Sequence, residues 1–275
     1  MAFQTWQIGL DIQNGQLCAL GIQRRRNGWQ LRHWWQHVLP KDTLRNGALQ
    51  RSAELTTVLQ CWRKQLPHHI SLRVGFPPQL VLQRQIDLPR QPLREPERSS
   101  YVRAAARRFF PIEPEALALD YRESPDYPGQ LCVTAARREM LEQWLACFAE
   151  AGLLPQVFEL TAAALRSLSL ALALDPAATL VHRLADHWLW FSPENKQQPC
   201  GWCTLDDAAD YTALRLRYLP AAAVIYYSAA EADSLPEGAR DLLPLDALQL
   251  MQPPLPQSSG SFALAAGLAL RPEDY

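Results

Sequence analysis

Apolar runs at residues 8–12 and 17–22, and alternating side chains at residues 29–34, are patterns typical of β-strands. Three strands are predicted, over residues 7–12, 16–24 and 29–38. Gln13-Asn14-Gly15 separates the first two strands, and Asn-Gly between two apolar runs favours a tight hairpin turn. Asp11 stands at the end of the first strand, next to this turn.

The spacing changes beyond residue 50, where apolar side chains recur every three or four positions. This predicts a helix over residues 52–66, with Ser52 as its N-cap and Pro67 as its end. A further strand is predicted at residues 70–76. Three strands, a helix and another strand indicate an α/β unit.

Strand-like and helix-like segments continue to alternate along the rest of the chain. A helix that opens near residue 137 is expected to end at Gly152, because glycine is favoured at helix C-caps. The other predicted strands lie at residues 82–89, 118–121, 131–136, 157–159 and 223–227 and in a hairpin at 179–191, and the other predicted helices at 95–109 and 261–271.

Composition is that of an ordinary globular protein, with 48% hydrophobic and 20% charged residues among 275. Residues 1–150 hold 20 basic and 14 acidic side chains, whereas residues 151–275 hold 7 and 14. The basic residues are scattered among acids except at Arg24-Arg25-Arg26, which favours a solvated face; direct DNA binding is the alternative. No membrane-spanning stretch or export signal is apparent, so we expect a cytoplasmic chain with reduced cysteines.

Two pairs of residues could carry chemistry of their own. His182 and His187 could ligate a metal, but their spacing across a predicted turn favours ordinary surface histidines, and we expect no metal site. Cys200 and Cys203 have thioredoxin-like spacing, yet no thioredoxin-like βαβ pattern precedes them. Incidental thiols are therefore the favoured interpretation, with a reversible disulfide as the alternative.

The order of segments over residues 6–172 resembles the PilM family of type IV pilus assembly proteins, and in particular a short branch named for DNA utilisation. Residues 8–22 resemble the opening hairpin of actin-like ATPases. Residues 74–78 resemble the point where a strand leaves the first subdomain, and residues 95–121 resemble the order of helix, aromatic-Pro-Ile and Asp-Tyr strand that follows. Residues 261–271 resemble the terminal helix of the family.

The resemblance implies a truncated actin-like (ribonuclease H-like) α/β fold of PilM type with an inserted α+β subdomain. The first actin-like lobe is expected at residues 1–75 together with 157–175. The inserted subdomain is expected at 76–155, and a reduced second lobe at 176–275.

The resemblance also identifies positions of a nucleotide site, and at these positions the chain departs from the family. Asp11 is kept, but Gln13 stands where the family has Gly, and its side chain obstructs close approach of phosphate. Cys18 stands where the family has Lys and supplies no positive charge, and Ser228 opens the Ser-Ala-Ala that replaces a Gly-rich adenosine loop. We therefore expect a degenerate site, no catalytic residues and no cofactor; an active ATPase of the assembly platform that binds ATP and Mg²⁺ is the alternative.

The function that the resemblance implies is that of a non-catalytic cytoplasmic adaptor in a type IV pilus-like machine for DNA uptake. The expected partner is the cytosolic N-terminal tail of a PilN-like (HofN-like) inner-membrane protein, with the assembly ATPase as a further candidate. No direct nucleic-acid contact is expected, and the membrane is reached only through the partner. An extended tail could bind in a groove between the first lobe and the insertion, on elements that carry Arg84, Arg103 and Arg107.

Overall fold

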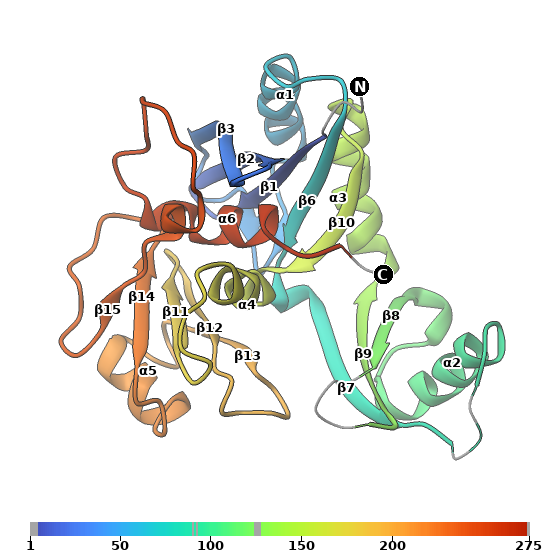
Figure 1. The fold of residues 1–275 in the computed structure, drawn as a ribbon. Helices are drawn as coiled ribbons and strands as arrows, with labels where there is room; N and C mark the ends of the chain where they lie inside the picture. The colour runs from blue at the N-terminus through green and yellow to red at the C-terminus, as the bar shows by residue number, and fades with distance from the viewer. Residues whose placement is uncertain (1–4, 90, 92, 124–127, 274–275) are drawn as a thin grey trace.

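The computed structural model describes residues 5–89, 91, 93–123 and 128–273 and contains three principal sheets (Figure 1). The first sheet has the strand order β10-β6-β1-β2-β3. Its strands are β1 (Trp6–Ile12), β2 (Gln16–Arg25), β3 (Gly28–Val38), β6 (Ile70–Phe76) and β10 (Pro155–Leu160). The strands predicted at residues 7–12, 16–24, 29–38 and 70–76 are therefore present. Strand β10 follows the insertion and pairs parallel with β6.

Helices cover both faces of this sheet. α1 (Ser52–Arg63) and α3 (Arg138–Glu150) pack on one face, where Trp62 and Trp144 are buried. The short strands β4 (Leu44–Arg45) and β5 (Ala48–Leu49) form a small hairpin before α1. The opposite face is covered by α4 (Thr161–Ala171) and α6 (Ala263–Ala269).

The second sheet has the order β13-β12-β11-β14-β15 and lies beyond α4 and α6 (Figure 1). Its strands are β11 (Thr179–Arg183), β12 (His187–Phe191), β13 (Cys200–Thr204), β14 (Ile225–Ala229) and β15 (Arg240–Asp241). Helix α5 (Tyr211–Tyr218) packs on its outer face. Two 3₁₀ helices, η3 (Pro244–Ala247) and η4 (Gly260–Phe262), lead back to α6.

The third sheet, β7-β9-β8, projects away from the other two (Figure 1). It consists of β7 (Val81–Asp87), β8 (Leu117–Glu123) and β9 (Gln130–Arg137), with α2 (Glu97–Phe109) packed on one face and the 3₁₀ helices η1 (Pro78–Leu80) and η2 (Pro114–Ala116) at its connections. Both β7 and β8 are edge strands, because each pairs only with β9.

The sequence-based prediction of the end of α3 is confirmed, whereas the predictions for the two ends of α1 are wrong. Gly152 has φ +69° and its N–H donates to the carbonyl of Ala149, so it ends α3 as expected. Ser52 is not the N-cap of α1, because the helix already begins at Ser52 and the preceding Arg51 makes no side-chain cap. Helix α1 also ends at Arg63, four residues before Pro67.

Within the described part of the chain, none of the helices is long and apolar enough to span a lipid bilayer.

Candidate functional site

The turn between β1 and β2 forms the floor of a cleft between the first and second sheets. The backbone N–H of Gln13 donates to the carbonyl of Gln16 at 2.8 Å, which closes the predicted hairpin. Asp11 and Gln13 are both buried here, and the amide of Gln13 donates a hydrogen bond to Oδ2 of Asp11. From the sequence, the Gln13 side chain is predicted to be an obstruction to phosphate. In the structure this side chain is hydrogen-bonded to the carboxylate of Asp11.

The cleft is also closed by a contact between the two sheets. The Nε2 amide of Gln16 lies 3.2 Å from Oε1 of Gln13 and 2.8 Å from the carbonyl of Ala230, which follows β14. Gln36 from β3 donates to Oε1 of Gln16 at 2.9 Å and orients it. A row of side-chain amides thus joins the first hairpin to the second sheet. Gln16 lies in the predicted hairpin, but nothing in its local pattern indicates this role.

Burial perturbs Asp11 strongly. It raises the pKa of this carboxyl from 3.8 to about 6, while the Gln13 hydrogen bond and His187 act in the opposite direction. Oδ1 of Asp11 and Oγ1 of Thr161 are buried without a hydrogen-bond partner among the described residues. Both side chains border Gly75, because a Cβ placed there would lie 3.1 Å from Oδ1 of Asp11 and 2.9 Å from the methyl group of Thr161.

The other two predicted nucleotide positions do not face open space. Cys18 pairs with Asp11 across the hairpin and is buried in the core, and burial raises the pKa of its thiol. Ser228 is buried on β14, with its Oγ 2.8 Å from Nδ1 of His182. The prediction of a surface location is wrong for His182, which is fully buried, and burial lowers its pKa to about 3. His182 is buried because β11 packs against a core on each of its two faces, and the five-residue spacing to His187 carries no information about that.

A cavity of about 30 Å³ remains in the cleft. It is lined from both sides, by Asp11, Gln13 and Asn14 of the first hairpin and by Asp186 and His187 of the second. Pockets for small-molecule ligands typically enclose roughly 300–1,000 Å³, whereas a cavity of about 30 Å³ has room for only about two water molecules. In this arrangement the residues do not fit a nucleoside triphosphate with its metal ion. Among the described residues, no group of three or more His, Cys, Asp or Glu side chains is arranged to hold a metal.

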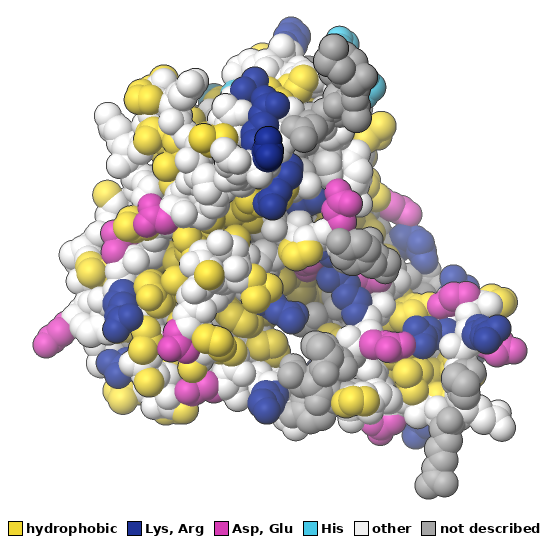
Figure 2. Space-filling view, viewed as in Figure 1, with side chains coloured by type: hydrophobic (Ala, Val, Ile, Leu, Met, Phe, Trp, Pro, Cys, Tyr) yellow, Lys and Arg dark blue, Asp and Glu magenta, His cyan; other side chains and the backbone are white. Residues whose placement is uncertain are grey.

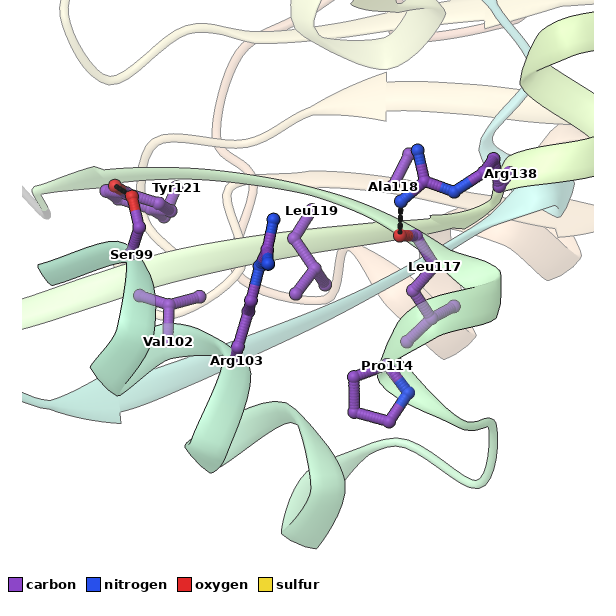
Figure 3. Close-up of a pocket in the computed structure, with 9 residues that line it drawn as sticks. All are labelled: Ser99, Val102, Arg103, Pro114, Leu117, Ala118, Leu119, Tyr121 and Arg138. Atoms are coloured by element: carbon purple, nitrogen blue, oxygen red, sulfur yellow. Dashed lines mark hydrogen bonds between the residues drawn. The ribbon is translucent and has the colours of Figure 1, made fainter. Parts of the chain in front are cut away.

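A larger cavity, of about 290 Å³, lies in the inserted part of the chain as a groove between α2 and the edge strand β8 (Figure 3). Its walls combine apolar side chains with polar groups at each end. It is lined by Ser99, Val102, Arg103, Pro114, Leu117, Ala118, Leu119, Tyr121 and Arg138. Helix α2 forms one wall because its apolar face packs on the sheet through Val102 and Ala106, which leaves Arg103 beside the groove.

The two ends of the groove differ in charge. At one end the hydroxyl groups of Ser99 and Tyr121 lie 2.9 Å apart, and both bond to the carboxylate of Glu95. At the other end Arg138, from the start of α3, donates to the carbonyl of Leu117 at 2.8 Å (Figure 3). The groove therefore has an acidic end, a basic end and an apolar middle.

The three arginines predicted to border a partner groove are separated by the structure. Arg103 points into the groove from α2 and forms no hydrogen bond or ion pair with any other described residue (Figure 3). Arg107 does not line it and pairs with Glu115 at 3.1 Å. Arg84 lies on β7, the opposite edge strand of the sheet, and does not line this groove. The groove lies within the insertion, whereas the partner groove predicted from the sequence lies between the insertion and the first lobe, so the role of Arg84 there stays a prediction.

Three groove residues were missed from the sequence: Ser99, Tyr121 and Arg138. Tyr121 is the last residue of the predicted strand at 118–121, whose Asp-Tyr ending formed part of the family resemblance. This was the one sequence signal that could have drawn attention to Tyr121. Arg138 enters the groove only because α3 starts directly after β9, which pairs Leu117 with Arg137.

The redox alternative for Cys200 and Cys203 has no geometric support. Both residues lie within strand β13, three positions apart, and alternation along a strand directs their side chains to opposite faces of the sheet. Burial raises the pKa of Cys200 to about 12 and that of Cys203 to about 11. No helix starts beside them, since α5 begins only at Tyr211.

Comparison with known sequences gives two related findings. The family model for "Type IV pilus assembly protein PilM" matches residues 9–180 of this chain. The chain is also similar to the DNA utilization protein HofM of Escherichia coli K12, with 29% identity over 270 residues that cover 98% of each protein.

Solved structures with similar folds include two secretion and pilus components. A chain of the PilM-PilN type IV pilus biogenesis complex superimposes with a TM-score of 0.68 at 19% identity, covering 96% of this chain and 97% of that one. The cytoplasmic domain of EpsL, an inner membrane component of the type II secretion system of Vibrio cholerae, gives a TM-score of 0.56 at 11% identity, covering 97% and 95%.

Proposed function

The chain belongs to the PilM family of type IV pilus assembly proteins and has its α/β actin-like fold, as the sequence resemblance implied, and from this premise we propose that it is a non-catalytic adaptor. It would act on the cytoplasmic side of a type IV pilus-like machine for DNA uptake. Its partner would be the cytosolic tail of a PilN-like inner-membrane protein. The similarity to HofM, named for DNA utilization, supports the assignment to DNA uptake, and the similarity to a chain of a PilM-PilN complex supports the choice of partner.

The observation that carries this proposal is the groove between α2 and the unpaired edge of β8. An extended peptide can add to an exposed strand edge through main-chain hydrogen bonds, while alternate side chains enter adjacent pockets. Leu117 and Leu119 supply apolar walls for such side chains. A volume of about 290 Å³ is enough for a few side chains of a peptide, and too small for a folded partner.

The charges at the two ends of the groove would fix the direction of the peptide. Arg103 points into the groove between these ends and forms no ion pair with a described carboxylate, although Glu115 interacts with it electrostatically. A carboxylate or carbonyl of the tail could therefore bind Arg103 without breaking an existing ion pair. Glu95 at the acidic end would accept from a basic or amide side chain of the tail, and Arg138 would lie at the basic end. Complementary charges of this kind contribute more to orientation and association rate than to affinity.

The non-catalytic part of the proposal rests on the cleft at the first hairpin. The amide of Gln13 bonds to Asp11, Gln16 bridges to Ala230, and the remaining cavity is about 30 Å³. Calorimetry with Mg²⁺ and ATP tests this part directly, and we expect no heat of binding. A binding isotherm that disappears in Asp11→Asn would contradict it and favour the active ATPase.

Peptide binding is tested by fluorescence anisotropy with a labelled synthetic peptide that has the sequence of the partner's N-terminal tail. We expect Arg103→Glu to weaken binding about tenfold, the equivalent of about 1.4 kcal/mol. Ala118→Trp, which fills the groove, should abolish binding. Arg84→Glu is the matched control, because it makes the same charge change on the other edge of the same sheet and should leave affinity unchanged. Unaltered affinity in both groove variants would place the peptide site elsewhere.

A further inference from the structure

One end of the first sheet gathers basic side chains that the proposed peptide site does not use. β1, β6 and β10 all begin there, since Trp6 pairs with Ile70 and Pro155 pairs with Leu72. The hairpin between β2 and β3 turns at the same end. α1 ends there as well, where Arg63 donates to the carbonyl of Gly152 at 3.2 Å. We call this surface the basic end; its cations are Arg24, Arg25, Arg26, Arg32, Arg63 and Lys64.

The basic end has a large excess of positive charge. The segments that form it, residues 5–10, 21–33, 62–71 and 150–156, carry these six Lys and Arg side chains and a single carboxylate, Glu150. None of the six forms an ion pair with a described carboxylate, whereas arginines elsewhere, such as Arg51 and Arg98, do. In Figure 2, Lys and Arg side chains run in a column over the region where α1 and β2 lie in Figure 1.

Aromatic and apolar side chains accompany these cations. The guanidinium of Arg24 lies 5.1 Å from the ring centre of Trp29, and that of Arg32 lies 5.4 Å from the ring centre of Trp6. Such stacking holds both arginines in an ordered, outward position while the indole rings stay partly exposed. Leu154, in the loop before β10, is 75% exposed.

We propose that the basic end binds directly to the surface of a bilayer that contains anionic phospholipid. Each Lys or Arg side chain close to such a surface is attracted by the anionic headgroups, so that several together give measurable binding. Tryptophan favours the level of the lipid headgroups, where an amphipathic ring is stable. The contact would be made by this chain itself, in addition to its proposed attachment through a membrane partner.

A bilayer fits this surface better than a nucleic acid does. A phosphate backbone would satisfy the arginines, but it offers no environment for an exposed leucine side chain, and Leu154 lies at the same end. Headgroups and the upper acyl region accommodate both kinds of side chain. Most of the arginines are carried by a hairpin tip and a strand, and α1 contributes only its last residue, Arg63, so none of the described helices at this end presents a row of basic side chains to a DNA groove.

The test is co-sedimentation of the full chain with vesicles of phosphatidylcholine alone and of an equimolar mixture with phosphatidylglycerol. The central variant is Arg25→Glu/Arg26→Glu at the hairpin tip, since both side chains are exposed and neither is stacked on an indole ring. Arg215→Glu/Arg217→Glu on α5 is the control, because it changes net charge equally on exposed side chains of the second lobe. Leu154→Gln tests the apolar contribution.

We expect binding to the anionic vesicles only, and a loss of affinity of about tenfold or more in the hairpin variant, with the α5 variant unchanged. Leu154→Gln should reduce the binding that persists at high salt, because only the electrostatic part is screened. Absence of binding to anionic vesicles, or an equal loss in both charge variants, would overturn the proposal. Tighter binding to duplex DNA than to anionic vesicles, lost in the hairpin variant, would overturn it in favour of a nucleic-acid surface.

Discussion

The side-chain amide of Gln13 donates a hydrogen bond to Oδ2 of Asp11, and both side chains are buried in the cleft between the two large sheets. A hydrogen bond to the ionised form lowers the pKa of a carboxyl, whereas burial raises it. Burial has the larger effect here, because the pKa of Asp11 is raised to about 6. The amide therefore offsets only part of the cost of a buried negative charge.

Asp11→Asn should stabilise the protein above pH 7. The folded state holds the Asp11 proton more tightly than the unfolded state, so the free energy of unfolding falls as pH rises from about 4 to about 6. Asparagine is neutral throughout, and the gain at pH 8 is at most about 3 kcal/mol from a shift of roughly two pKa units.

Urea unfolding at pH 8 and at pH 4 measures this gain, which should be small at the lower pH. Asp206→Asn, on an exposed turn, is the control and should change neither value. A lower stability of Asp11→Asn at pH 8 would show that the ionised carboxylate is stabilising, contrary to the effect of burial.

His182 should give the opposite pH dependence. Its folded-state pKa is about 3, below the ordinary 6.5, so the folded state disfavours the proton and stability is lost as pH falls below 6.5. His182→Leu loses the hydrogen bond to Ser228 at a cost of about 1 kcal/mol at pH 8, but it removes this acid sensitivity. As pH falls from 8 to 4.5, the urea midpoints of His182→Leu and of the natural chain should converge and then cross. The control is His68→Leu at an exposed histidine, whose midpoints should follow those of the natural chain.

Gly267→Ala should destabilise the fold severely, although alanine favours helices. A Cβ at this position would lie 2.0 Å from the carbonyl oxygen of Ala164, which belongs to the backbone of α4. The clash separates α4 from α6, so we expect a loss of about 3 kcal/mol or more, against a gain in helix propensity of about 1 kcal/mol.

Thermal unfolding and the soluble fraction on expression measure this effect. The control is Gly260→Ala, where the nearest atoms to the new Cβ would be 3.6 Å away. Equal melting temperatures for the two variants would mean that α4 and α6 can separate without cost.

Thiol reactivity should separate the cysteines by burial. Cys61 is exposed and should be alkylated first by iodoacetamide in the native protein, as mass spectrometry would detect. Cys200 and Cys203 should react slowly, because the thiolate is the reactive form and burial raises both pKa values. Faster modification of Cys200 than of Cys61 would restore the redox alternative.

The sequence determined many of the elements and their type, although its patterns did not predict α4, α5 or β13. Apolar runs located β1 and β2, alternation located β3, helical spacing located α1, and the positive-φ requirement located the turn at Gly15 and the cap at Gly152. These signals are local, since each depends on the conformation of a few consecutive residues. The spatial arrangement of the elements was implied by the family resemblance, because a pattern of a few consecutive residues does not indicate which elements pack together.

Tertiary structure decided what the candidate site residues do. Gln13 was identified as an obstruction, but only folding placed its amide on Asp11 and brought Ala230, over 200 residues away, to Gln16. In the same way, Arg103 and Arg138 line one groove, while Arg84 lies on the other edge of the sheet. Contacts of this kind depend on which strands become neighbours, and that is fixed by burial of the whole core, so the pattern around any single residue does not reveal it.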